Sequence, residues 1–241
     1  MLIQSMQVSI IIPAYNCLNI VKEQIVVLES WVLNWKFSTE IIIVIDGNFK
    51  QEDYSKLSKN THHIKIVGYR ENKGKGFAIK EGFKYSKGAF ILYTDADIPF
   101  SESSYKNVIE ELIKANKNTW VIGDRTLPES EYFEKTSWVR KIGSDIFLRI
   151  IKWTLGNSIA DTQCGLKGFT RESGGLVLNK SFVNRFAFDY ECLFIAKQKN
   201  IKIKKVPVAL RNQSKSSVNV FRDGIKLFID VFYINFINKY D

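Results

Sequence analysis

Two aspartates, Asp95 and Asp97, follow the apolar run AFILYT. Side chains two positions apart on an extended chain point the same way, so these carboxylates would repel each other unless a cation lay between or beside them. Oxygen ligands suit the hard cations Mg²⁺ and Mn²⁺, and a cation held in this way can also bind a diphosphate. The spacing therefore predicts a metal and phosphate site, although an isolated Asp-x-Asp is also explained by a turn before a helix.

Polar motifs follow three other apolar runs in the first half of the chain. The first run ends in PAYN (13–16), the second in DG (46–47), and the third is followed by NKGKG (72–76). Asp46 can accept a hydrogen bond from a base or a ribose hydroxyl, and a glycine-rich basic loop at a helix N-terminus suits an anion. No GxGxxG follows the first run, which argues against a dinucleotide-binding dehydrogenase. Each motif alone is explained by an ordinary turn, but the four together favour a nucleotide site.

The elements that must hold these motifs alternate along the first half of the chain. Short β-branched runs predict strands at 8–13, 40–45, 63–67, 89–94 and 119–123. Amphipathic stretches predict helices at about 20–34, 51–59, 75–86 and 102–115, with Asn19 and Ser101 as N-caps. This order is typical of an α/β fold with a Rossmann-like, open and mostly parallel sheet flanked by helices. In such sheets ligands bind beyond the carboxyl ends of the strands.

The second half of the chain does not alternate in this way. Its sequence predicts helices at about 137–155, 190–199 and 221–238, and a half-exposed strand at the start of 201–210. We find no internal repeat and no linker. We therefore expect one domain over residues 1–241, with a nucleotide half at about 1–123 and an acceptor half at about 124–241.

Length and composition narrow the class of protein. A chain of 241 residues with 45% hydrophobic and 25% charged residues is expected to fold. Its three cysteines are far apart and form no CxxC pair, so we expect neither a disulfide framework nor a zinc site. This use of cysteine predicts a protein of the reducing cytoplasm. The chain has no signal-peptide pattern and no run of 18 apolar residues, so we expect neither secretion nor a membrane span.

The net charge of +10 is concentrated in residues 121–241, which carry 20 basic and 12 acidic side chains. A nucleic acid, an anionic membrane, a phosphate-bearing substrate or a merely solvated lysine-rich surface would each explain this excess. A nucleic-acid-binding module would need aromatic residues interleaved with arginine or a docking helix, and we find neither. It is kept only as an outside alternative, and we expect no nucleic-acid partner.

The strand-end motifs resemble those of the inverting family 2 glycosyltransferases, which have the GT-A fold. Within that family the chain is similar to polyprenyl-phosphate glycosyltransferases, above all the dolichyl-phosphate β-glucosyltransferases. The resemblance covers about residues 8–215 and includes an acceptor-side extension at the C-terminal end. Its motifs beyond the first half are GDR (123–125), DTQCGLK (161–167), FTRE (169–172) and FAFDYE (186–191).

The resemblance implies a role for each matching residue. A nucleotide-sugar donor would contact Pro13, Tyr15, Asn16, Asp46, Lys75, Asp95, Ala96, Asp97 and Lys215. Asp95 and Asp97 would hold Mg²⁺ or Mn²⁺. Catalysis is assigned to Asp189, Arg125 and Asp161, and the sugar and acceptor pocket to Gln163 and Asp189. The implied reaction is metal-dependent, inverting transfer of a hexose, with UDP-glucose favoured, to a polyprenyl phosphate.

A second acceptor stays open, namely a sugar hydroxyl of a lipid-linked glycan or a cell-surface polysaccharide precursor. A lipid phosphate is already an anion and needs no base, whereas a hydroxyl needs a carboxylate base, with Asp189 as the first candidate and Asp161 as the second. A transferase that binds nucleotide without turnover is a further alternative. Three features depart from the subgroup pattern: Asp124 replaces serine, Leu166 replaces phenylalanine, and the N-terminal membrane helix of the eukaryotic proteins is absent.

The tail is the most apolar helical segment, yet it carries Lys226 and Asp230. This pattern predicts a helix that lies on an anionic membrane surface, or one that packs on the body or on a second copy of the chain in a homo-oligomer. We accordingly expect a cytoplasmic protein, peripheral at the inner face of the membrane.

Overall fold

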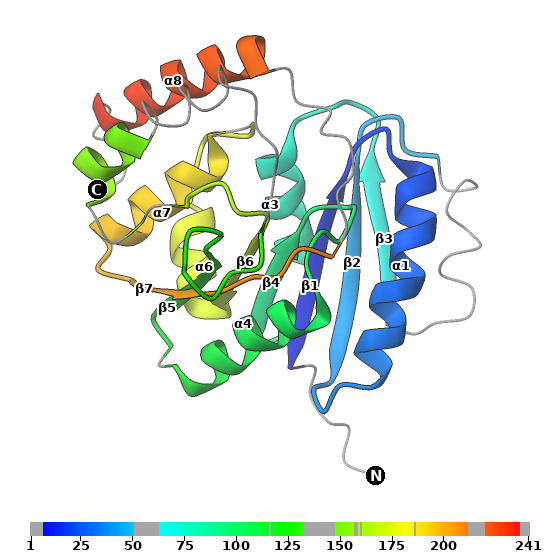
Figure 1. Cartoon of the computed structure of the whole chain (residues 1–241). Helices are drawn as coiled ribbons and strands as arrows, with labels where there is room; N and C mark the ends of the chain where they lie inside the picture. Colours follow the sequence, from blue (N-terminus) through cyan, green and yellow to red (C-terminus); the bar gives the residue numbers. More distant parts are fainter. Residues whose placement is uncertain are drawn as a thin grey trace.

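Seven strands of the described residues form one mixed sheet in the order β3-β2-β1-β4-β6-β5-β7 (Figure 1). This computed structural model describes residues 7–50, 63–115, 117–132, 148–156, 159, 161–185, 187–211 and 220–236, with the side chains of the last segment described from Lys226. The strands are β1 (Val8–Ala14), β2 (Thr39–Asp46), β3 (Ile64–Tyr69), β4 (Phe90–Thr94), β5 (Thr119–Gly123), β6 (Leu166–Thr170) and β7 (Lys202–Val206).

Strand β6 is antiparallel to both of its neighbours, β4 and β5. The other pairs, β1 with β2 and β4, β2 with β3, and β5 with β7, are parallel. The start of β6 therefore lies at the same edge of the sheet as the carboxyl ends of the other strands. Side chains that are far apart in the sequence therefore lie near one another at this edge.

Helices cover both faces of the sheet. The described helices are α1 (Leu18–Leu33), α3 (Lys75–Tyr85), α4 (Glu102–Lys114), α6 (Arg171–Leu178), α7 (Phe188–Gln198) and α8 (Val220–Phe236), together with a helical segment at 148–155. Helices α1 and α4 pack on one face, and α3, α6 and α7 pack on the other. Helix α8 lies outside α7 (Figure 1).

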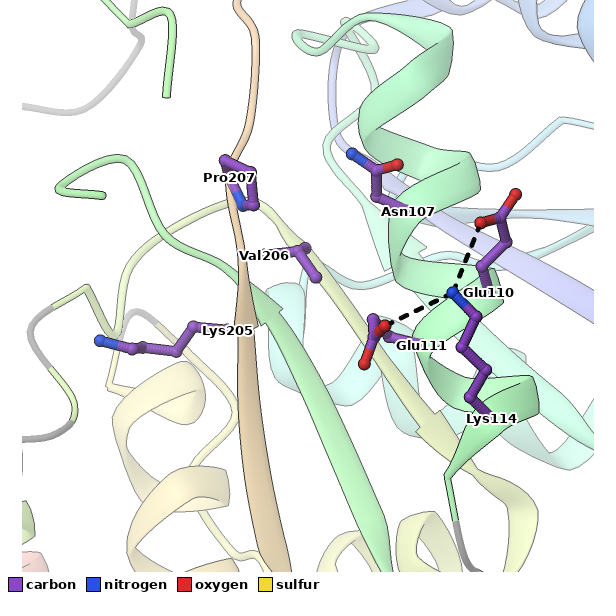
Figure 2. Close-up of a pocket in the computed structure, with 7 residues that line it drawn as sticks. All are labelled: Asn107, Glu110, Glu111, Lys114, Lys205, Val206 and Pro207. Atoms are coloured by element: carbon purple, nitrogen blue, oxygen red, sulfur yellow. Dashed lines mark ion pairs between the residues drawn. The ribbon is translucent and has the colours of Figure 1, made fainter. Parts of the chain in front are cut away.

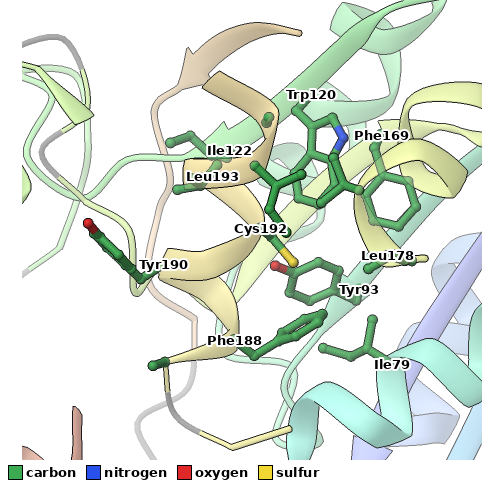
Figure 3. Close-up of a cluster of buried hydrophobic side chains, with 14 of the residues drawn as sticks. Ile79, Tyr93, Trp120, Ile122, Phe169, Leu178, Phe188, Tyr190, Cys192 and Leu193 are labelled. Atoms are coloured by element: carbon green, nitrogen blue, oxygen red, sulfur yellow. The ribbon is translucent and has the colours of Figure 1, made fainter. Parts of the chain in front are cut away.

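The central strands are buried on both sides because both faces carry helices. In β1, Ile10 and Ile12 contact the layer of α1 and α4, whereas Ile11 contacts the layer of α3 and α7. The second layer is rich in aromatic side chains, and the ring of Trp120 stacks on that of Phe169 with their centroids 4.7 Å apart (Figure 3). This packing fixes the strands whose ends carry the polar motifs.

The predicted strands are confirmed to within two residues at each end. One N-cap prediction is wrong, and two elements were not predicted. Helix α1 begins at Leu18 after Cys17, so Asn19 lies inside its first turn and is not the N-cap. The sequence analysis also missed β6 and α6, because it expected neither a strand nor a helix between residues 164 and 178. The predicted helix at 51–59 lies outside the described residues, and so do residues 137–147 of the helix predicted at about 137–155.

Candidate active site

Asp46, at the end of β2, holds the loop that leads into α3. Its Oδ1 accepts from the backbone N–H of Lys73 at 2.7 Å, and its Oδ2 accepts from the backbone N–H of Gly74 at 2.8 Å and from Nδ2 of Asn72 at 3.0 Å. Gly74 adopts a φ of 101°, and a Cβ there would lie 2.2 Å from the carbonyl oxygen of Asn184. The buried carboxylate thus fixes the basic loop at the N-terminus of α3.

Lys75, the first residue of α3, joins two carboxylates from distant parts of the chain. Its Nζ lies 3.0 Å from Oδ1 of Asp95 and 3.3 Å from Oδ2 of Asp189. Burial alone would lower the pKa of Lys75, but the charges of Asp189 and Asp95 outweigh it and raise that pKa. Lys75 is therefore held as a cation between the end of β4 and the start of α7.

Asp189 is buried, and its carboxylate makes three polar contacts, with side chains from β4, β6 and α3. Its Oδ1 accepts from the hydroxyl of Tyr93 at 2.8 Å and lies 2.7 Å from Nζ of Lys167, while its Oδ2 faces Lys75. Nζ of Lys167 also donates to the carbonyl oxygen of Cys164 at 2.6 Å. Burial would raise the pKa of Asp189, but Lys167 and Lys75 lower it to about 2. Asp189 is thus a fully ionised and firmly held carboxylate.

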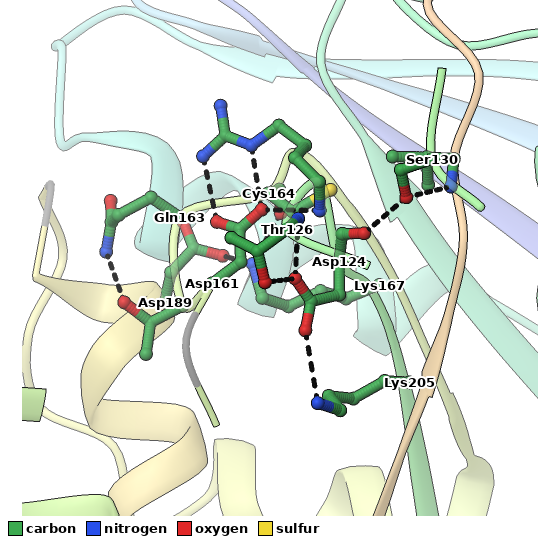
Figure 4. A network of polar contacts seen from close by, with 12 residues as sticks. Asp124, Thr126, Ser130, Asp161, Gln163, Cys164, Lys167, Asp189 and Lys205 are labelled. Atoms are coloured by element: carbon green, nitrogen blue, oxygen red, sulfur yellow. Dashed lines mark hydrogen bonds and ion pairs between the residues drawn. The ribbon is translucent and has the colours of Figure 1, made fainter. Parts of the chain in front are cut away.

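Arg125 and Asp161 form a bidentate pair beside this network (Figure 4). Nε of Arg125 lies 2.7 Å from Oδ2 of Asp161, and a terminal guanidinium nitrogen lies 2.8 Å from Oδ1. The backbone N–H of Arg125 donates to the same carboxylate at 3.0 Å. Burial would raise the pKa of Asp161, but the hydrogen bonds and charge of Arg125 hold it below its ordinary value. The pair fixes the guanidinium group at the end of β5.

Asp124, which stands where the resemblance expects serine, is also buried and paired. Its Oδ1 accepts from the backbone N–H and the hydroxyl of Thr126, and its Oδ2 lies 3.4 Å from Nζ of Lys205 (Figure 4). Lys205 also lines a pocket of about 300 Å³ between α4 and β7 (Figure 2). The other residues that line this pocket come from α4 and the end of β7. None of them belongs to the predicted site.

The remaining predicted residues that the structure describes lie at the same edge of the sheet. Tyr15 is 51% exposed just beyond β1, and Asn16 adopts a φ of 49° there. Pro13, Ala96, Asp97 and Gln163 are half-buried. Lys215 lies outside the described residues.

Asp95 and Asp97 are the residues that could hold a divalent cation. No group of three or more histidine, cysteine, aspartate or glutamate side chains with metal-site geometry occurs in the part of the chain that the structure describes. Mg²⁺ commonly uses only one or two protein carboxylates and completes its shell with water and substrate phosphates. The half-buried pair at the end of β4 fits that requirement.

Sequence reasoning missed Lys167, Tyr93 and Gly165. A Cβ at Gly165, just before β6, would lie 1.9 Å from Oδ2 of Asp95, so any other residue there would displace that carboxylate. Tyr93 and Lys167 are direct partners in the pairing of β4 with β6. Lys167 belongs to a motif that was recognised, but its complete burial could not be expected, because lysine is rarely buried unless it is paired.

Fold and site together define a class of enzyme. An open, mostly parallel sheet with an Asp-x-Asp and a cluster of fixed cations beyond its carboxyl edge is the architecture of a GT-A glycosyltransferase. The family model described as "Glycosyl transferase family 2" matches residues 9–174. The chain belongs to glycosyl transferase family 2.

Curated relatives agree with this assignment. A dolichyl-phosphate beta-glucosyltransferase of Dictyostelium discoideum is 32% identical over 97% of this chain and 75% of its own length. The human protein of the same name is 27% identical over 95% of this chain and 74% of its own length. The chain is accordingly a glycosyltransferase.

Solved structures share the fold at low sequence identity. Glucosyl-3-phosphoglycerate synthase from Mycobacterium tuberculosis, in complex with UDP, has a TM-score of 0.69 and 14% identity over 95% of this chain and 79% of that one. Mannosyl-3-phosphoglycerate synthase from Rubrobacter xylanophilus has a TM-score of 0.70 and 16% identity over 95% of this chain and 72% of that one. At these identities the likeness supports the fold alone.

Proposed function

We propose that this glycosyltransferase moves glucose from UDP-glucose to a polyprenyl phosphate with inversion at the anomeric carbon. An oxygen of the lipid phosphate attacks that carbon, the bond from the carbon to the diphosphate oxygen breaks, and UDP leaves. The relatives named dolichyl-phosphate beta-glucosyltransferase support the sugar and the lipid phosphate. UDP complexes of proteins with the same fold support the nucleotide.

The pairing of Asp189 is the observation that carries the choice of acceptor. A hydroxyl nucleophile needs a base whose pKa lies near the working pH, whereas Asp189 is buried, paired with two lysines, and has a pKa of about 2. The second candidate base, Asp161, is held by Arg125 in the same way. A phosphate acceptor is already ionised and needs no base. The fixed cations at the site would offset its repulsion by the diphosphate.

A divalent cation completes the proposal. Asp95 and Asp97 would hold Mg²⁺ or Mn²⁺ together with the donor diphosphate, and the bound cation would supply charge stabilisation for the leaving group. A complex of the glucosyl-3-phosphoglycerate synthase with Mn²⁺ and UDP, at a TM-score of 0.67, supports this choice of metal. Lys75, which lies against Asp95, and Arg125 at the end of β5 would add positive charge to the site. Tyr15, which is exposed beyond β1, would lie against the nucleoside.

A polyprenyl phosphate lies in a membrane, so the proposed enzyme must contact one, and α8 has an exposed apolar face that could make this contact. Its exposed apolar side chains, Ile229, Phe232, Tyr233 and Phe236, follow the i, i+3, i+4, i+7 spacing of one helix face. Val231 and Ile234 on the opposite face are buried against the body.

An apolar pocket of about 250 Å³ joins α8 to the segment 148–155, where Trp153 is 77% exposed. Arg149 and Lys152 of the segment 148–155 and Lys226 of α8 are exposed. Aromatic and basic side chains together fit an anionic lipid surface better than a neutral one, so we propose that α8 and Trp153 lie on anionic membrane. None of the described helices is both long and apolar enough to cross a membrane.

A thermal-shift panel tests the donor. At about 100 times its dissociation constant, UDP-glucose with Mn²⁺ should add about 2.7 kcal/mol of apparent stability, which raises the midpoint by roughly 5–10 °C for a chain of this size. UDP-glucose with EDTA and GDP-mannose with Mn²⁺ are the matched controls, and both should give smaller shifts. A larger shift with GDP-mannose, or no shift with any nucleotide sugar, would contradict the proposed donor.

A further inference from the structure

Lys167 is a lysine with no exposed surface, and the proposed reaction does not use it. It lies in β6 directly opposite Tyr93 of β4, so the two side chains leave the same face of the sheet. Both converge on a single atom, Oδ1 of Asp189, at 2.7 Å and 2.8 Å. The paired strands thus form a rigid base that sets the position of this carboxylate.

Charges of alternating sign continue from Lys167 to the donor side of the site. Oδ2 of Asp189 faces Nζ of Lys75 at 3.3 Å, and Nζ of Lys75 lies 3.0 Å from Oδ1 of Asp95. Lys167 and Asp189 are both buried, whereas Lys75 and Asp95 are partly exposed. These four charged side chains therefore form a row that runs from Lys167 in the interior of the protein to the Asp-x-Asp at the surface.

We infer that Lys167 is a positioning residue for the donor: it fixes Asp189, and Asp189 in turn holds the ammonium group of Lys75 beside Asp95. The inference rests on the proposed function, in which Lys75 and Asp95 meet the diphosphate. Without Lys167, Oδ1 of Asp189 keeps the hydroxyl of Tyr93 as a donor but loses its cation. The carboxylate then turns toward Lys75, which remains as its counterion, and changes the position of the Lys75 ammonium group. Lys75 is then displaced from the place where the diphosphate binds.

Binding of UDP in the presence of Mn²⁺, measured by calorimetry on the whole chain, tests this inference. Lys167→Met keeps the length of the side chain and removes its charge, and we expect it to raise the dissociation constant of UDP about tenfold, as loss of an outer partner of a site ligand commonly does. Asp189→Asn should have a similar effect. The control is Lys204→Met, which breaks a pair with Glu111 away from the site and should leave UDP binding unchanged.

The double variant shows through which residue Lys167 acts. Lys167→Met with Asp189→Asn should bind UDP as tightly as Asp189→Asn alone, because the effect of Lys167 passes through Asp189. Removing both charges also avoids leaving one of them buried and unpaired, so this comparison decides the matter even if Lys167→Met alone does not fold. Clearly weaker binding by the double variant would mean that Lys167 acts on UDP directly, which would overturn the inference.

A pH series separates positioning from a purely structural role. The Lys167→Met substitution removes one of the two cations that face Asp189. The carboxylate still faces Lys75, the hydroxyl of Tyr93 and the thiol of Cys192, and Asp95 lies beyond Lys75. Its pKa should rise, so the carboxylate takes up a proton as the pH falls and releases Lys75. The ratio of the variant's dissociation constant to that of the wild type should therefore grow from pH 8 to pH 5, whereas the ratio for Asp189→Asn stays constant.

Two results would refute the inference. A folded Lys167→Met chain that binds UDP as the wild type does, or one whose ratio is the same at every pH, leaves Lys167 with a structural role only. Failure of the proposed function has a different signature, because the wild-type chain itself would then not bind UDP with Mn²⁺.

Discussion

At the scale of single residues, the carboxylates of the site differ in how deeply they are buried. Asp46, Asp161 and Asp189 are buried, and each accepts at least three hydrogen bonds or ion pairs from fixed groups. Asp95 and Asp97 are half-buried at the strand end. The first group orders the loops and cations of the site, and in the proposed function the second group would meet the metal and the donor.

Asp97→Ala tests the metal assignment. Loss of this carboxylate should remove the part of UDP binding that depends on Mn²⁺ and lower glucosyl transfer on the order of a hundredfold or more, because the diphosphate loses its bridge to the protein. Calorimetry with Mn²⁺ and with EDTA measures the first effect, and a transfer assay measures the second. Glu110→Ala, an exposed carboxylate on α4, is the control. Transfer near the wild-type rate in Asp97→Ala would show that the metal is held elsewhere.

The sequence predicted which residue types stand at the strand ends, but not how they pair. Lys75, Asp95 and Asp189 were each identified, yet nothing in the sequence indicates that one ammonium group lies between the two carboxylates. Such a contact depends on where α7 meets the sheet. The burial of Lys167 was missed for the same reason, since its partner is 22 positions further along the chain.

At the scale of elements, the alternating half of the chain was predictable and β6 was not. The sequence LKGFT has neither the alternation of a half-buried strand nor the unbroken apolar run of a central one. Its Lys167 is buried by an ion pair, and a Cβ at its Gly168 would lie 2.7 Å from a methyl group of Val108 on α4. The strand therefore exists because of contacts with α4, α7 and β4, which local sequence patterns do not contain.

Helix α8 gives a prediction at the same scale. Phe232→Ser with Phe236→Ser should reduce binding to anionic vesicles on the order of tenfold for each residue, because each exposed ring would otherwise bury apolar surface in the bilayer interface. Vesicle flotation at low and high salt measures this effect. The matched control is Val26→Ser with Leu33→Ser, which removes equally exposed apolar side chains from α1.

Two outcomes would count against a membrane surface on α8. One is equal binding of wild type and variant to anionic vesicles. The other is a dimer of the wild-type chain in gel filtration that the variant loses, which would show that a second copy of the chain covers this face instead.

At the scale of the whole molecule, the fold brings polar motifs from both halves of the chain to one edge of a single sheet. The antiparallel β6 matters most here, because it places residues 161–167 beside the ends of β4 and β5. Proteins with TM-scores near 0.7 to this chain are named for transfer to 3-phosphoglycerate, so the fold alone does not specify the acceptor. The prediction of one domain with a nucleotide half and an acceptor half stays a prediction.

Glucosyl transfer from radiolabelled UDP-glucose to two lipids of equal chain length, a polyprenyl phosphate and the corresponding neutral polyprenol, tests the central claim most directly. With Mn²⁺ present, we predict a β-linked glucosyl phosphate lipid from the first and no product from the second, because the two candidate bases, Asp189 and Asp161, are already paired with cations. Transfer to the polyprenol at a comparable rate, or to a sugar hydroxyl but not to the phosphate, would contradict the account.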